Sequence, residues 1–128
     1  MKNLLILLIM MFCFGFVKSQ EIGMVTQNDG WLKVEDIDGN SLYNGSGSSG
    51  KLMGFSSKII VTQNYNDTHV YKINRYGSLE SIYSGNSVNG KVVNVAGMSV
   101  FTKTKGGDNC KYTISSGGRL ENDYCRNY

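Results

Sequence analysis

The sequence predicts an all-β protein whose main part is built from about three tandem antiparallel four-stranded β-meander repeats. Three observations lead to this fold class. The 128 residues include 16 glycines and no proline, so the turns must be made by residues that adopt positive φ. No segment after the N-terminal apolar run has the i, i+3, i+4, i+7 apolar spacing of an amphipathic helix. The sequence also resembles itself at a shift of 40 residues.

The N-terminal residues are typical of a secretory signal peptide. A positively charged start precedes an apolar run from Leu4 to Val17, and small or modest residues follow as far as Ser19. The run has about 14 residues, whereas a membrane-spanning helix needs about 20. We therefore expect residues 1–19 to be a signal peptide cleaved after Ser19, and residues 20–128 to form a single β-repeat domain. The mature protein is expected to be secreted, or periplasmic in a bacterium, and free of the membrane; a retained anchor is the alternative.

An internal repeat appears when the sequence is shifted by 40 residues. Gly50-Lys51 then falls on Gly90-Lys91, and the apolar positions that follow also coincide. Residues 60–64 have a partial earlier copy in residues 24–28. This series, in order along the chain, indicates duplication of one supersecondary unit. The copies cover approximately residues 20–46, 47–86 and 87–128.

Each full copy has the pattern of four short strands separated by turn residues. The expected strands are 51–55, 59–64, 69–74 and 78–84 in the middle copy, and 91–95, 98–103, 110–115 and 119–125 in the third. The first copy lacks its opening strand, because residues 22–27 correspond to 59–64, so about eleven strands are expected. Ile59-Ile60-Val61 is apolar at successive positions, which predicts that both faces of this strand are covered.

A four-stranded meander with doubly buried inner strands resembles a blade of a β-propeller. The resemblance covers nearly the whole mature chain and is one of period and strand pattern. It implies sheets stacked face to face around an axis, with binding in the loops at one end. A β-trefoil, in which three such units close one domain, is the alternative, and an ordinary β-sandwich is a third.

The number of units also bears on the oligomeric state. About three blade-like units are too few to close a ring, which leaves the outer faces of the first and last units bare. Head-to-tail contact between such faces can close a ring. The blade-like fold therefore predicts a homodimer through the first and third repeats, whereas a trefoil predicts a monomer.

Charge and reactive residues argue against several function classes. Removal of residues 1–19 takes away two of the 13 basic residues and none of the 10 acidic ones, which leaves a net charge of +1. This balance, with no Lys/Arg cluster, argues against binding to nucleic acid or to an anionic membrane. The single histidine, His69, has no nucleophile motif or metal-ligand spacing around it. We expect no enzyme activity, no metal site and no cofactor.

Cys110 and Cys125 are the two cysteines of the mature chain, and an even count in an exported protein predicts one disulfide. Two buried free thiols are the alternative. A two-residue hairpin turn at Gly117-Gly118 would set the two cysteines directly opposite each other. The same register puts Leu120 on the face opposite Ile114, so the hairpin needs a bulge to keep both in the core.

The candidate ligand site comes from residues that repeat. Tyr43 and Tyr83 end equivalent strands and lead into equivalent glycine-rich loops. Tyrosine rings can stack on the C–H faces of a sugar, while amide and hydroxyl groups bind its hydroxyls. The alternative is that these tyrosines close the ends of the core, with their hydroxyls in water. The candidate ligand-binding residues are Asn28, Trp31, Tyr43, Asn44, Tyr83 and Asn86.

Together these features predict a small secreted β-repeat binding module whose inter-repeat loops contact a glycan or an extracellular protein. The alternative is a structural or surface-assembly protein whose repeats stack on other copies.

Overall fold

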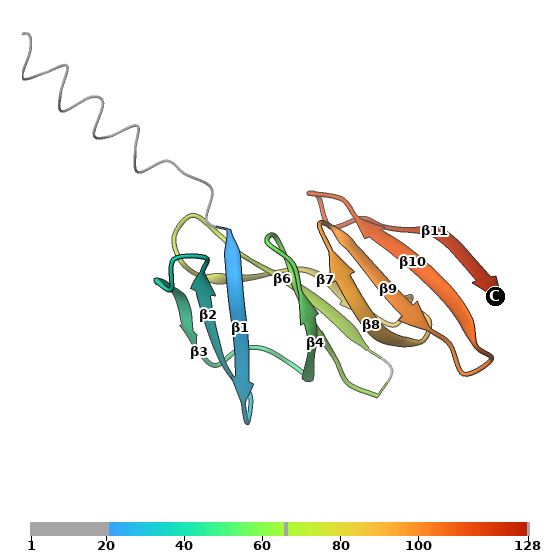
Figure 1. Ribbon diagram of the computed structural model, residues 1–128, viewed down its shortest axis with the longest axis horizontal. Helices are drawn as coiled ribbons and strands as arrows, with labels where there is room; N and C mark the ends of the chain where they lie inside the picture. The colour runs from blue at the N-terminus through green and yellow to red at the C-terminus, as the bar shows by residue number, and fades with distance from the viewer. Residues whose placement is uncertain (1–20, 66, 128) are drawn as a thin grey trace, which may run out of the picture.

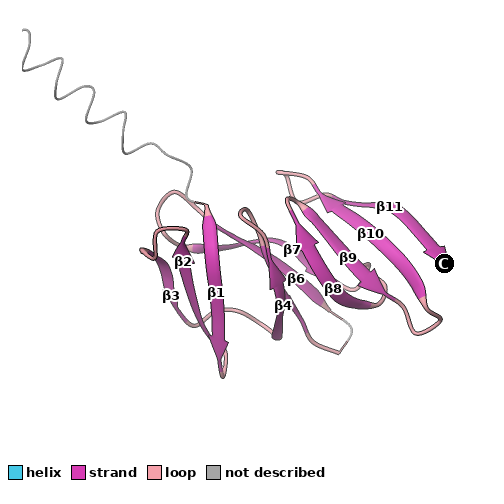
Figure 2. Cartoon of the chain, viewed as in Figure 1, coloured by secondary structure: helices cyan, strands magenta, loops and turns pink. Residues whose placement is uncertain are grey.

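The computed structural model describes residues 21–65 and 67–127, which form eleven strands and no helix (Figure 2). The all-β class is therefore confirmed. The strands are β1 (Ile22–Asn28), β2 (Trp31–Asp36), β3 (Ser41–Gly45), β4 (Lys51–Phe55), β5 (Ile60–Gln63), β6 (Thr68–Ile73), β7 (Leu79–Gly85), β8 (Lys91–Ala96), β9 (Ser99–Lys103), β10 (Asp108–Ile114) and β11 (Leu120–Asn127). The expected signal peptide lies outside the described residues. Among the described residues, no helix has the length and hydropathy to cross a membrane.

The strands form three separate antiparallel meanders. The first sheet has the order β1-β2-β3, the second β4-β5-β6-β7 and the third β11-β10-β9-β8. The sheets follow one another in chain order along the longest axis of the molecule (Figure 1). In the described part of the chain, no strand of one sheet pairs with a strand of another, so the closed barrel of the β-trefoil alternative is not formed.

Strand boundaries in the second and third sheets differ from the expected ones by no more than two residues. The first sheet has three strands, one fewer than each of the others. Turn residues mark these boundaries because each meander reverses direction at a polar, glycine-containing segment.

Two apolar layers, one on each face of the second sheet, hold the three sheets together. Ile60 and Tyr71 pack with Val25, Leu32 and Val34 of the first sheet. On the other face, the second sheet packs against the third through the buried side chains of Ile59, Val61, Val70, Val92, Val95, Val100 and Ile114. The expectation that both faces of the strand at Ile59-Ile60-Val61 are covered is confirmed. We call the contact between the first and second sheets the first interface, and that between the second and third sheets the second interface.

A glutamine side chain crosses each interface in the same way. The Gln27 Nε2 group donates a hydrogen bond to the carbonyl of Gly50 at 2.9 Å, and its Oε1 accepts one from the N–H two residues further on at 2.7 Å. Gln63 repeats this arrangement with the third sheet: its Nε2 lies 2.8 Å from the carbonyl of Gly90, and its Oε1 lies 3.1 Å from the N–H two residues further on. Both glutamines therefore fasten the opening strand of the next sheet.

The loop that enters the second sheet is held by two hydroxyl groups. The Tyr71 hydroxyl accepts a hydrogen bond from the N–H of Ser49 at 3.0 Å, and the Thr62 hydroxyl donates to the carbonyl of the same residue. The third sheet has the same pair of bonds. The Tyr112 hydroxyl accepts a hydrogen bond from the N–H of Asn89 at 2.9 Å, and the Thr102 hydroxyl donates one to the carbonyl of Asn89 at 2.6 Å.

The hairpin of β10 and β11 contains the Cys110–Cys125 disulfide, as expected. The two cysteines are direct partners across the hairpin, and Ile114 is paired with Leu120. Both pairings are possible because the register shifts between Lys111 and Tyr112, which leaves one residue of β11 unpaired. The bulge that the sequence required is therefore present.

The turn of this hairpin differs from the expected two-residue turn at Gly117-Gly118. It belongs to a five-residue type that also occurs at residues 36–40, 74–78 and 104–108 and here spans 115–119. In each, a side-chain oxygen of the first residue accepts a hydrogen bond from the N–H of the fifth. The fourth residue is a glycine with φ between 77° and 88°. The two-residue prediction was wrong because it did not count the bond that the Ser115 hydroxyl accepts from the backbone N–H of Arg119.

Candidate functional site

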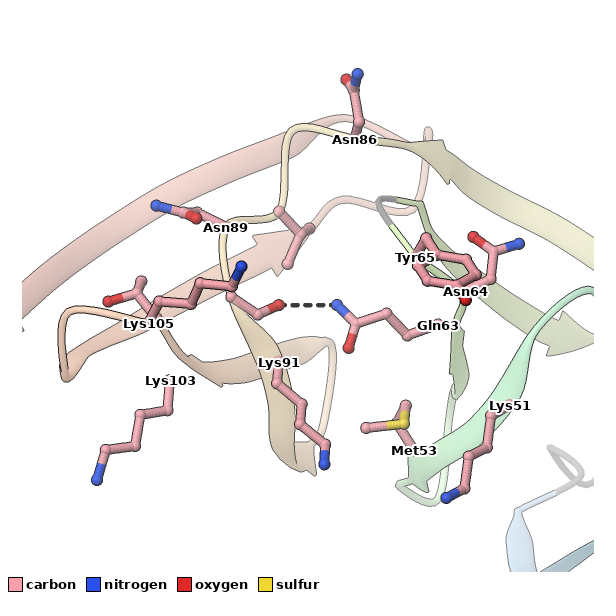
Figure 3. A pocket seen from close by; sticks show the side chains of 13 residues that line it. Lys51, Met53, Gln63, Asn64, Tyr65, Asn86, Asn89, Lys91, Lys103 and Lys105 are labelled. Carbon is pink, nitrogen blue, oxygen red and sulfur yellow. Dashed lines mark hydrogen bonds between the residues drawn. The ribbon is translucent and has the colours of Figure 1, made fainter.

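A groove of about 840 Å³ opens at the second interface (Figure 3). Its walls are the starts of β4 and β8, the tip after β5, the loop between β7 and β8, and the turn after β9. Gly90 lets the loop between β7 and β8 come close to β9. Its φ is 95°, and a Cβ added at this position would lie only 2.7 Å from the carbonyl oxygen of Lys103. The bond from Gln63 to Gly90, dashed in Figure 3, ties this loop to the second sheet.

Four lysines line the groove: Lys51 and Lys91 begin β4 and β8, Lys103 ends β9, and Lys105 lies in the following turn. Lys91 and Lys103 are direct partners in the third sheet. In Figure 3 the side chains of Lys51, Lys91 and Lys103 extend to the same side, while Lys105 reaches toward Gln63. No aspartate or glutamate lines the groove. The ion pairs formed among the described residues use other lysines, so the four ammonium groups have no acidic partner there.

Uncharged polar groups complete the lining. Asn64, Asn86 and Asn89 also line the groove, and their side chains make no hydrogen bond to any described residue. Tyr65, at the tip after β5, is fully exposed at the rim. These groups can donate and accept hydrogen bonds without breaking any bond of the fold.

The structure separates the residues that the sequence suggested as a ligand site. Among them, Asn86 alone lines the groove. Asn28, Trp31 and Asn44 lie together on the outer face of the first sheet: Asn28 is the direct partner of Trp31, and the Trp31 ring N–H donates to the Asn44 side chain. The Trp31 side chain is half exposed there.

Tyr43 and Tyr83 lie at the two interfaces, half buried against the apolar layers. The Tyr43 hydroxyl donates to the carbonyl of Ser46, and the Tyr83 hydroxyl accepts from the N–H of Ser87 at 3.1 Å. Each ring covers the glycine two residues further along its strand. The arrangement is that of residues closing the ends of the core, except that the hydroxyls bind loop backbone instead of water.

The lysines were missed by reasoning on the sequence, which found no Lys/Arg cluster along the chain. The fold corrects that premise, because it assembles a cluster from lysines that are far apart in sequence. A signal was present: the repeated Gly50-Lys51 and Gly90-Lys91 place two lysines at the same position of adjoining sheets. The charge along the chain could not reveal that Lys103 and Lys105 would join them.

His69 on β6 is placed away from these lysines, with its Nδ1 2.8 Å from the Ser84 hydroxyl. Its buried Nε2 has no hydrogen-bond partner among the described residues. Within the described ranges, no three His, Cys, Asp or Glu side chains are grouped to hold a metal ion. Comparisons with protein-family models and with curated proteins find no match to this chain.

Proposed function

We propose that the protein is a small secreted binding module made of tandem blade-like β-meander units, and that it binds its ligand in the groove of the second interface. The observation that carries this proposal is the groove itself, a concave surface between sheets where the side chains of lysines and asparagines have no partners among the described residues. Polar groups that converge on a cleft and are left unused by the fold are typical of a ligand site.

The repeated unit is supported by bonds that recur in chain order. Gln27 and Gln63 make the same pair of bonds across successive interfaces. The first sheet begins at the second strand of the unit, and the other two sheets have all four. Secretion is supported by the disulfide, since disulfides persist in oxidising compartments, and by the N-terminal apolar sequence.

Blocking the groove tests the proposal. Asn89 is exposed and lines the groove, and among the described residues only its backbone makes hydrogen bonds, so Asn89→Trp adds bulk at the groove without removing one of these bonds. Ser49→Trp is a matched control, because Ser49 has the same backbone bonds at the first interface and does not line the groove. Protein purified after expression of the full chain is applied to an array of glycans and extracellular proteins. We expect Asn89→Trp to abolish the binding that the wild type and Ser49→Trp share. Equal binding by all three proteins would contradict the proposal.

The alternative function, assembly by stacking on other copies, is favoured by one observation. Met24, Trp31 and Ile37, on the first sheet and the turn after β2, are exposed by 55%, 52% and 73%. The outer face of the third sheet carries a charged and polar group instead: Asp123 lies there between the Lys111 ammonium at 3.7 Å and the Thr113 hydroxyl at 2.5 Å. This difference between the two ends weakens a head-to-tail contact. Light scattering coupled to gel filtration decides the matter: a concentration-dependent dimer supports assembly and the expected homodimer, and a monomer contradicts both.

A further inference from the structure

The lysines of the groove create a positive field that the fold leaves unbalanced. Lys51, Lys91, Lys103 and Lys105 come from three strands and a turn, and no carboxylate of the described residues lines the same surface. Like charges that are gathered in a concave site repel one another and raise the local potential, which attracts an anion. An anionic ligand would remove this repulsion when it binds.

A comparison of the second sheet with the third shows that the fold does not need the charges of Lys103 and Lys105. Gln63 is the direct partner of Lys51 at the start of the second sheet, just as Lys103 is the direct partner of Lys91 at the start of the third. Two residues further on, Tyr65 occupies the position that Lys105 has in the third sheet. The same backbone thus forms in the second sheet with glutamine and tyrosine at the positions where the third sheet has lysine.

The uncharged lining indicates which kind of anion fits. Three asparagines whose side chains make no hydrogen bond to a described residue, together with the exposed Tyr65 ring, suit the hydroxyls and C–H faces of a sugar. Lysine ammonium groups act as point charges for carboxylate or sulfate groups, and the groove contains no arginine for bidentate recognition of phosphate. We infer that the groove binds an acidic oligosaccharide, with carboxylate or sulfate groups along the sugar chain. This inference rests on the proposed function of the groove.

The experiment is isothermal titration calorimetry of the protein with four probes: a heparin-derived hexasaccharide, a hexamer of galacturonic acid, maltohexaose and a single-stranded DNA oligonucleotide. We expect at least one acidic sugar to bind about tenfold more tightly than maltohexaose and than DNA. The sulfated and carboxylated probes tell which acidic group is recognised. The affinity of the protein for the acidic sugar should decrease as the salt concentration rises from about 50 mM to about 300 mM, because salt screens the lysine charges.

The variant that tests the lysines is Lys103→Gln combined with Lys105→Tyr, which introduces the residues found at the corresponding positions of the second sheet. It should keep the melting temperature and lose about tenfold in affinity for the acidic sugar. Lys58→Gln is the control, since Lys58 is exposed and does not line the groove; its affinity should stay within about twofold.

Each other outcome overturns a defined part of the argument. The affinity for maltohexaose could equal that for the acidic sugars, with both lost in Asn89→Trp. This result would overturn the inference and leave the proposed function standing. DNA binding as tight as that of the sugars would overturn it in favour of a nucleic-acid ligand. Absence of binding to all four probes would overturn the inference, and the array with the two tryptophan variants then decides separately whether the proposed function also fails.

Discussion

The two interfaces between the sheets use one set of bonds but differ in the side chains that face solvent. Gln27 at the first interface and Gln63 at the second fasten the opening strand of the next sheet through the same two backbone groups. The residues paired with these opening strands differ, since Lys51 is opposite Gln63 and Lys91 is opposite Lys103. The lysine-lined groove lies at the second interface.

This comparison separates structural residues from candidate functional ones. Bonds that recur at both interfaces are those that position the backbone, so they account for the fold. Charges that occur at one interface only are not required by that backbone. These charges are therefore the candidates for a function specific to this protein. The first interface therefore serves as an internal control for the second.

The largest expected difference between the two interfaces concerns the disulfide, which belongs to the third sheet. Replacing both Cys110 and Cys125 by alanine should lower the free energy of unfolding by about 3 kcal/mol, the value expected for a closed loop of about 15 residues. The first interface contains neither cysteine, so its amides should keep their protection from hydrogen exchange. Urea unfolding and exchange measurements check this. Two freely alkylatable thiols in the native wild type would contradict it.

The next effect compares the two glutamines. Gln27→Met and Gln63→Met keep the length of the side chain and remove its hydrogen bonds. Gln63 also donates to the Thr68 hydroxyl at 3.1 Å, so it makes three bonds where Gln27 makes two. Each substitution leaves partly buried backbone groups without their partners. The free energy of unfolding should therefore fall by about 2 kcal/mol for Gln63→Met and by about 1 kcal/mol for Gln27→Met. Urea unfolding measures both, and the reverse order would show that the interfaces are not fastened as described.

The smallest effect concerns the first sheet and is a dependence of stability on pH. Hydrogen bonds from the Asn40 backbone and side chain and from the Asp38 and Gly39 N–H groups hold the pKa of Asp36 below its usual 3.8. A carboxylate with a lowered pKa in the folded state stabilises the fold above its unfolded pKa, and that contribution is lost as the pH falls through the folded value. Asp36→Asn places there the residue that Asn74 supplies in the second sheet.

Thermal unfolding from about pH 5 to about pH 2 should therefore show a smaller loss of stability in Asp36→Asn than in the wild type. Asp38→Asn changes a carboxyl of the same turn that accepts no hydrogen bond among the described residues, and should follow the wild type. Parallel curves for all three proteins would remove the assigned role of Asp36.

The strands were predicted well from the sequence, because each strand follows from the local pattern of apolar and turn residues. The apolar run at Ile59-Ile60-Val61 was sufficient to predict a strand covered on both faces, and the even cysteine count was sufficient to predict the disulfide. The turn at 115–119 was not predictable from glycine positions alone, because a serine hydroxyl decides its register.

The candidate site was harder to predict, because it depends on which faces the sheets turn toward each other. Asn86 was identified from its glycine-rich loop and does line the groove. Trp31 and Asn44 were grouped with it by composition, but the pairing of β1 and β2 puts them on the outer face of the first sheet. Lys103 and Lys105 join Lys51 only through the stacking of two sheets, which the spacing of the sequence does not encode.

The most direct test of the central claim is a map of amide chemical shifts in isotope-labelled protein titrated with the acidic oligosaccharide that binds. The account predicts shifts at the second interface, from Asn86 to Lys91 and from Lys103 to Gly107, with the matching loop from Ser46 to Lys51 of the first interface unaffected apart from Lys51 itself. Shifts of equal size at both interfaces, or shifts confined to the outer face around Trp31, would contradict it.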